Sequence, residues 1–138
     1  FPLIFPGWIF QDLFSILGFI IAITISIYLS YSIYFCMVCF AFWFGEVRSL
    51  VVAYNISNIV LSGQIIPIKL FPDLIRELIS FTPLPYLVDF PVSIATNTIP
   101  MNLWINHILL AIGWCGIMTL TGKLIYHRGI RVYGGYGA

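Results

Sequence analysis

The sequence predicts an all-α integral membrane protein with three transmembrane helices and an outer re-entrant helical hairpin between the last two. Of its 138 residues, 61% are hydrophobic and only 8% are charged, and the mean hydropathy is +1.04. Long apolar runs alternate with short polar or charged segments, which is typical of successive membrane spans. The net charge of +1 offers no basic surface for nucleic acid, so no nucleic-acid partner is expected.

The first span is expected over residues 13–44, which contain no Asp, Glu, Lys or Arg. This run is long enough to cross a hydrocarbon core of ~30 Å with some tilt. Small residues recur at every fourth position, at Gly18, Ala22, Ser26 and Ser30. Because a stripe of small side chains lets membrane helices approach closely, this face is expected to pack against another helix. Residues 1–11 predict an interfacial lead-in, with Trp8 at headgroup depth.

A short turn carrying Glu46 and Arg48 leads into a second span, expected over residues 49–68 and again without charge. Its polar residues Asn55, Asn58 and Ser62 share one helical face, and Ser57 belongs to a neighbouring stripe of small residues. Amides in hydrocarbon need hydrogen-bond partners, so we expect these side chains inside the bundle or against a cavity. They either line a substrate path or hold helices together.

Residues 71–96 are expected to form two half-length helices instead of a span. Five prolines prevent one continuous helix of ~20 residues: Pro67, Pro72, Pro83, Pro85 and Pro91. The first half-helix has an apolar face and a charged face. The turn at Pro83, Pro85 and Tyr86, and the carboxylate of Asp89 after it, are candidates for an outer gate. Alternatively, Asp89 only hydrogen-bonds nearby backbone or Tyr86.

The third span is expected over residues 104–126, with Gly113 and Gly116 providing close contacts or flexibility, and residues 127–138 form a tail. Basic residues gather at the end of this span and in the tail (Lys123, Arg128 and Arg131), and one lies at Arg48. The positive-inside rule therefore places the tail and the Arg48 turn on the cytoplasmic side. The hairpin then lies on the outer side.

Catalytic patterns are not visible in the sequence. There is no Ser–His–Asp set, no pair of carboxylates and no cluster of metal ligands, and His107 is expected to be an interfacial, hydrogen-bonded histidine. The segment from Gly116 to Lys123 has the wrong spacing for a phosphate loop. We therefore expect no enzyme activity, no metal and no cofactor on this chain.

Several short motifs follow one another over nearly the whole chain: SGQIIPI at 62–68, FP at 71–72, LPY at 84–86, FPV at 90–92 and RGIRVY at 128–133. In this combination the chain resembles the C-terminal half of a permease subunit of the type 2 ATP-binding-cassette (ABC) transporters. More narrowly, it is similar to a bacterial branch known as an uncharacterised transport system permease.

The resemblance implies six spans in the full subunit, of which these are the last three. It also implies a second permease subunit, the same or homologous, and cytoplasmic ABC ATPase subunits that bind ATP and Mg. The assembly would lie in the lipid of the bacterial cytoplasmic (inner) membrane and work by alternating access, mostly as an exporter. Glu46 and Arg48 are then candidates for a secondary contact with an ATPase subunit.

Two other functions fit the low charge and the many aromatic residues. One is a small structural subunit of a larger respiratory or photosynthetic membrane complex, and the other is a channel-forming subunit that works without ATP. The amphipathic half-helix and the repeated Phe-Pro pairs favour the permease. The substrate and the choice between homodimer and heterodimer stay open.

Overall fold

The structure, a computed structural model, describes residues 13–66 and 68–133, and all regular elements in these ranges are helices. The longer ones are α1 (Leu13–Cys39), α3 (Arg48–Leu61) and α6 (Met101–Tyr133). The shorter ones are α2 (Ala41–Phe44), η1 (Ile68–Leu70), α4 (Asp73–Ser80), η2 (Leu84–Tyr86) and α5 (Asp89–Ala95). The predicted all-helical class is confirmed. The expected lead-in with Trp8 and the end of the tail lie outside the described residues.

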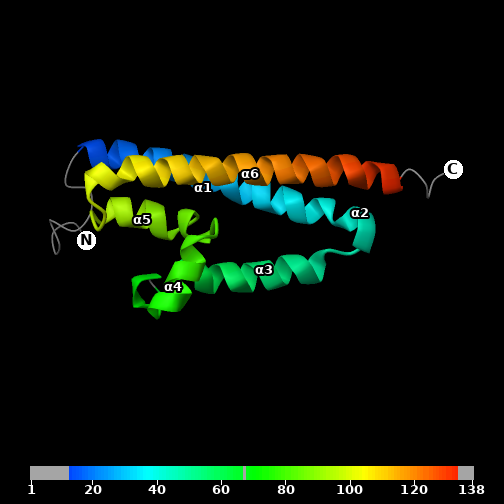
Figure 1. Ribbon diagram of the computed structural model, residues 1–138, viewed down its shortest axis with the longest axis horizontal. Helices are drawn as coiled ribbons and strands as arrows, with labels where there is room; N and C mark the ends of the chain where they lie inside the picture. Colours follow the sequence, from blue (N-terminus) through cyan, green and yellow to red (C-terminus); the bar gives the residue numbers. More distant parts are fainter. Residues whose placement is uncertain (1–12, 67, 134–138) are drawn as a thin grey trace.

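The two longest helices, α1 and α6, lie side by side and run in the same direction (Figure 1). The chain returns between them through α3, which runs in the opposite direction. The elements α4, η2 and α5 gather at the end where α1 and α6 begin, and α5 packs against α1. We call this the hairpin end. The opposite end carries Arg48, Lys123, Arg128 and Arg131, and we call it the basic end.

The core lies where α1 and α6 meet each other and, at the hairpin end, where η2 and α5 pack against them. On α1 the residues Gly18, Ala22 and Ser26 are buried, and Ser30 is half-buried. A Cβ built on Gly18 would lie 2.5 Å from Cζ3 of the Trp104 ring. The Trp104 indole N–H donates a hydrogen bond to the Ile99 carbonyl at 3.1 Å, which fixes the ring in place. The small side chains of α1 thus give room to the largest side chain of α6.

The glycines of α6 that pack closely against α1 and α2 are not those that the sequence suggested. Apart from the adjoining residues and backbone of α6 itself, no described atom lies within 4 Å of a Cβ built on Gly113 or Gly116. A Cβ on Gly122 would lie 2.7 Å from the Phe35 ring, and one on Gly129 would collide with the Phe42 ring. Gly122 and Gly129 are seven residues apart and share the face that packs on α1 and α2, whereas Gly113 and Gly116 fall outside it.

Two stretches are long and apolar enough to cross a membrane, Leu13–Phe44 and Met101–Val132. The helix in the predicted second span, 49–68, ends already at Leu61, because Gly63 adopts φ +88° and turns the chain. With 14 residues, α3 is about 21 Å long at ~1.5 Å per residue, less than a ~30 Å core. By contrast, α6 begins before the predicted 104–126 and continues to Tyr133, so the start of the expected tail is helical.

Candidate functional site

The segment between α3 and α6 is broken into short helices, and prolines flank the first of them, α4. Pro72 stands immediately before α4, where its missing N–H is not needed, and its carbonyl accepts the Arg76 N–H at 2.9 Å. After Ser80 the chain turns through Pro83, whose carbonyl accepts the Tyr86 N–H at 3.2 Å. The short helices η2 and α5 follow. The predicted turn at Pro83, Pro85 and Tyr86 is therefore a compact corner between α4 and α5.

Tyr86 fixes this corner to the two long helices. Its backbone carbonyl accepts a hydrogen bond of 2.7 Å from the buried Ser26 hydroxyl of α1. Its ring is buried, and the ring centroids lie 6.0 Å from Phe90 and 6.3 Å from His107 of α6. One residue of the predicted packing stripe thus holds one residue of the predicted gate.

Asp89 connects the end of α3 to the start of α5. Its backbone N–H donates to the Ser62 carbonyl at 3.1 Å, and the Ile68 backbone N–H hydrogen-bonds its carboxylate. A Cβ built on Gly63 would lie 3.1 Å from the Asp89 Cβ, and the φ of +88° at Gly63 also favours glycine. The backbone partners expected for Asp89 in its structural role are present.

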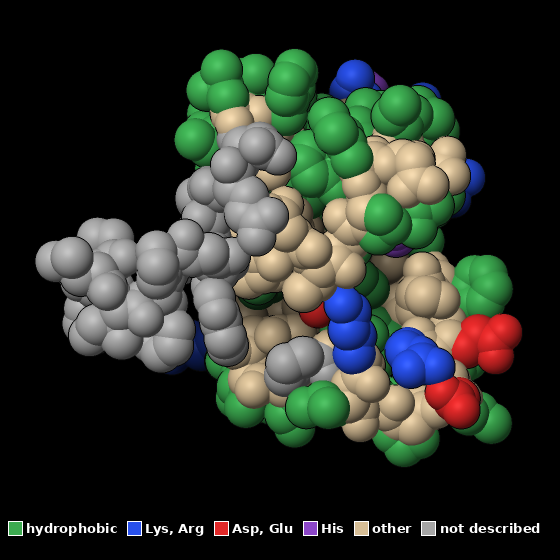
Figure 2. Space-filling model, turned by 90° about the vertical axis from the view of Figure 1, so that its left-hand side faces the viewer, with side chains coloured by type: hydrophobic (Ala, Val, Ile, Leu, Met, Phe, Trp, Pro, Cys, Tyr) green, Lys and Arg blue, Asp and Glu red, His purple; other side chains and the backbone are tan. Residues whose placement is uncertain are grey.

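The Asp89 carboxylate lines a cavity of about 160 Å³, which we call the hairpin chamber. Its walls are Ile68, Arg76, Ser80, Pro85, Tyr86, Asp89, Phe90, Ile99 and His107. Burial raises the pKa of Asp89, while the hydrogen bond from Ile68 and the nearby Lys69 and His107 side chains oppose the rise. Figure 2 views the molecule from the hairpin end, where Lys, Arg, Asp and Glu side chains lie close together among hydrophobic ones.

The chamber can hold water or a small polar group between a carboxylate, a guanidinium and an imidazole. In the part of the chain that the structure describes, no group of three or more His, Cys, Asp or Glu side chains is placed to hold a metal ion. The described ion pair, Asp73 with Arg76, is exposed on α4. These features fit a gate or a binding pocket.

The predicted polar residues of the second span do not share one environment. Asn55 accepts a hydrogen bond from the Tyr34 hydroxyl of α1. Ser57 is exposed and donates to the Ala53 carbonyl of its own helix at 2.9 Å. Asn58 is half-buried and Ser62 is fully buried. Asn55 thus bonds to α1, Ser57 points to the surface, and Asn58 and Ser62 point inward.

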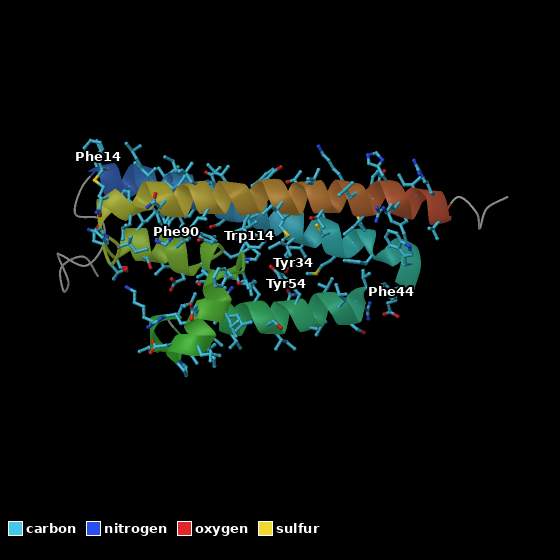
Figure 3. All side chains as sticks on the ribbon, viewed as in Figure 1. Phe14, Tyr34, Phe44, Tyr54, Phe90 and Trp114 are labelled. Atoms are coloured by element: carbon cyan, nitrogen blue, oxygen red, sulfur yellow. The ribbon has the colours of Figure 1, made fainter. Side chains whose placement is uncertain are left out.

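Three inward-facing oxygens of this segment have no hydrogen-bond partner among the described residues. They are the Tyr54 hydroxyl, Asn58 Oδ1 and Ser62 Oγ, spaced four residues apart on one helical face. Figure 3 shows Tyr54 and Tyr34 between α3 and α1, and their ring centroids are 5.5 Å apart, edge to face. Buried oxygens without partners are unfavourable, so this face is a place for water, substrate or another chain. Tyr54 was not predicted as a site residue, although its four-residue spacing from Asn58 is visible in the sequence.

Glu46 lies in the turn between α2 and α3, and Arg48 is the first residue of α3; both are at the basic end. Both are exposed, and neither forms an ion pair with a described residue. Gly45 makes the turn with φ +69°. Their expected contact with an ATPase subunit stays a prediction.

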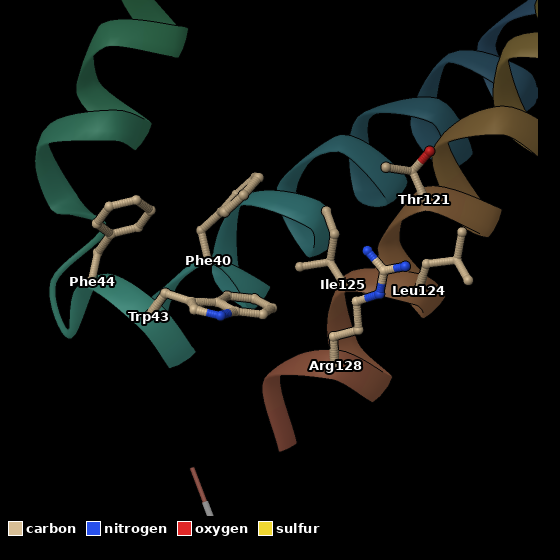
Figure 4. A pocket seen from close by; sticks show the side chains of 7 residues that line it. All are labelled: Phe40, Trp43, Phe44, Thr121, Leu124, Ile125 and Arg128. Atoms are coloured by element: carbon tan, nitrogen blue, oxygen red, sulfur yellow. The ribbon is translucent and has the colours of Figure 1, made fainter. Parts of the chain in front are cut away.

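A second cavity, which the sequence did not predict, lies beside this turn. It is an open groove of about 620 Å³ between α2 and α6, lined mostly by aromatic and aliphatic side chains and by Arg128 (Figure 4).

One comparison with known proteins found a match. The model of the family described as "ABC-2 family transporter protein" matches residues 8–137 of the chain. No curated protein and no solved structure matches the chain.

Proposed function

The chain belongs to the ABC-2 transporter family, and from this membership we propose that it is the C-terminal half of the permease subunit of an ATP-driven exporter. The membership confirms the resemblance to a type 2 ABC permease, and with it a membrane location and a role as a transmembrane transporter subunit. It also implies a partner ABC ATPase, since subunits of this family are generally not catalytic. ATP and Mg would bind to that partner.

The directions of the helices support three membrane crossings. Two helices that cross a bilayer in the same direction require a return crossing between them. α1 and α6 run in the same direction, and α3 is the antiparallel segment between them (Figure 1). The lengths of α4 and α5 support a re-entrant hairpin, because α4 has 8 residues and α5 has 7. At ~1.5 Å per residue neither reaches halfway through a ~30 Å core.

The orientation follows from charge. The basic end lies on the cytoplasmic side of the bacterial inner membrane, and the hairpin end lies outside. The Glu46–Arg48 turn then faces the cytoplasm, within reach of an ATPase subunit. The hairpin chamber, with Asp89, forms part of an outer gate.

The path would lie beside α3, between this subunit and a second permease, and its opening would expose the inward face of α3. The three oxygens without partners, on Tyr54, Asn58 and Ser62, support this assignment. A substrate or a file of water molecules would supply the missing hydrogen bonds during transport. Closure of the ATPase subunits on ATP would tilt the two permeases and open this path outward.

The first test is affinity purification of the full-length protein in mild detergent, with mass spectrometry of stoichiometric partners. We expect a cytoplasmic subunit with a phosphate loop, at about one copy per permease. If no ATPase appears under conditions that retain other partners, the proposal is overturned. Copurification of a redox complex would instead establish a structural subunit, and conductance from the purified chain alone would establish a channel.

A second test concerns the cytoplasmic turn. The double charge reversal Glu46→Lys with Arg48→Glu is expected to reduce ATPase copurification and transport. The matched control is Lys69→Glu, a reversal of an exposed charge at the hairpin end. Equal copurification of both variants would contradict a contact at the turn.

A further inference from the structure

We propose that the groove between α2 and α6 is a binding site for one anionic phospholipid, with its phosphate on Arg128 and an acyl chain along the aromatic wall. The proposal goes beyond the transporter function. It concerns a site at the basic end, far from the hairpin chamber.

The groove has two walls of different origin. Trp43 and Phe44 belong to α2, and Phe40 directly precedes it. α6 contributes Thr121, Leu124, Ile125 and Arg128. Figure 4 shows the Phe40 and Trp43 rings on one side and the Ile125 and Arg128 side chains on the other. The volume of about 620 Å³ falls within the ~300–1,000 Å³ of small-molecule sites. The lining is almost wholly apolar apart from Arg128 and the Thr121 hydroxyl.

Arg128 supplies a positive charge without a counter-ion. Its side chain is exposed, and no described carboxylate lies within ion-pair distance of it. Lys123, Arg131 and Arg48 add positive charge to the same end. Among the acidic residues that the structure describes, Glu46 alone lies there. The basic end therefore attracts anions, and the groove places one guanidinium at the edge of an apolar slot.

This combination fits an amphiphile with a negative head. A guanidinium binds phosphate oxygens through two parallel hydrogen bonds. Indole rings favour the depth of the lipid headgroups, and basic residues just beyond a membrane helix bind anionic lipid. A free phosphate would leave the apolar wall unused, and an apolar helix from another subunit would leave Arg128 unpaired. A phospholipid satisfies both parts of the groove.

Trp43 allows a direct measurement. The full-length protein is placed in phosphatidylcholine vesicles and titrated with phosphatidylglycerol that carries bromine atoms on its acyl chains, which quench tryptophan fluorescence on contact. The signal of Trp43 is the difference between the protein and its Trp43→Phe variant. We expect brominated phosphatidylglycerol to quench this signal at lower mole fraction than brominated phosphatidylcholine does.

Variants of α6 test the role of the charge. Arg128→Gln is expected to weaken phosphatidylglycerol binding about fivefold, the effect of about one basic residue at an anionic membrane. Arg131→Gln removes a charge that does not line the groove, and it is expected to have the smaller effect. Arg128→Lys keeps the charge and is expected to retain part of the preference, which separates loss of binding from loss of folding.

Other outcomes would overturn the proposal. Equal quenching by the two lipids, or equal effects of Arg128→Gln and Arg131→Gln, would show that the groove does not select the headgroup. Protection of Trp43 from both lipids would show that another helix or a second copy of the chain covers the groove. Displacement by millimolar inorganic phosphate would assign the site to a soluble anion. None of these measurements needs ATP or an ATPase partner. A result against the lipid site therefore leaves the transporter proposal standing.

Discussion

The helices α1 and α3 contain similar residues. They differ in how far the rest of the described chain buries them and supplies hydrogen-bond partners for their polar groups. Ten of the 27 residues of α1 are buried, whereas none of the 14 residues of α3 is. The polar groups of α1 find partners within the chain: the Ser26 hydroxyl bonds the Tyr86 carbonyl, and the Ser15 hydroxyl bonds Asn97 Oδ1 at 3.1 Å. On α3 and at its end, three oxygens have no described partner. A polar residue in a membrane helix is thus either part of the subunit's own packing or part of a surface that something else completes.

The largest difference in the free energy of unfolding is expected between two variants that each add one methyl group, one on α1 and one on α6. Gly18→Ala places a Cβ against the fixed Trp104 ring, and such overpacking costs about 1–3 kcal/mol. Gly113→Ala is the matched control, because its Cβ meets open space and Ala favours the helix by up to about 1 kcal/mol. Unfolding of both full-length variants in a denaturing detergent measures the difference in free energy. Equal stabilities would mean that the contact between α1 and α6 is looser than described.

Removal of one hydroxyl from each helix should give the next largest effect. Ser26→Ala leaves the buried Tyr86 carbonyl without its partner, which costs about 1–3 kcal/mol. Ser57→Ala removes an exposed hydroxyl that bonds only its own helix, and such a change stays within about 0.5 kcal/mol. Thermal midpoints of the two variants in the same detergent test this. A Ser57 variant as unstable as the Ser26 variant would indicate that α3 is also packed within the subunit.

On α3, a substitution on the inward face should change substrate-stimulated ATPase activity more than it changes stability. Asn58→Leu removes an oxygen without a partner, so the free energy of unfolding should stay within about 0.5 kcal/mol or rise. If this face lines the substrate path, substrate-stimulated ATPase activity of the reconstituted complex falls. Ser57→Leu, on the exposed side of the same helix, should leave that activity unchanged. Unaltered activity in Asn58→Leu would assign Asn58 to helix packing.

The smallest effect on stability is expected at Asp89, which joins the start of α5 to the end of α3. Because its pKa in the folded protein is raised, the folded state holds the proton more tightly than the unfolded state does. Stability from this group is therefore greatest at low pH and falls as the pH rises from the ordinary value of about 3.9 to the raised one. Asp89→Asn keeps an acceptor for the Ile68 N–H but removes the charge, so the loss of stability with rising pH should become smaller. Glu77→Gln, which replaces an exposed carboxylate on α4, should leave this loss of stability unchanged.

The features that could be predicted from the sequence are those set by local composition. Apolar runs indicated the two long helices, prolines indicated the broken segment before α6, and the four-residue stripe on α1 marked the face that is buried. Each rests on residues close together in the chain, which is where helical periodicity is informative.

The features that could not be predicted depend on pairs far apart in the chain. Gly122 and Gly129 look no different from Gly113 and Gly116 until α6 is set against Phe35 and Phe42. The early end of α3 depends on Gly63, which is held against Asp89. The groove exists only because α2 and α6 meet there. Single-sequence periodicity contains none of these pairings.

The length of α3 has a consequence for the lipid around it. A wall of about 21 Å beside a hydrocarbon layer of ~30 Å is a hydrophobic mismatch, and a bilayer meets a short wall by thinning locally. α1 and α6 impose no such strain, since each is more than 25 residues long. The membrane is therefore expected to be asymmetric around this subunit, with the two leaflets drawn together beside α3. For a substrate with a polar head and an apolar body, that side offers the shortest passage from one leaflet to the other.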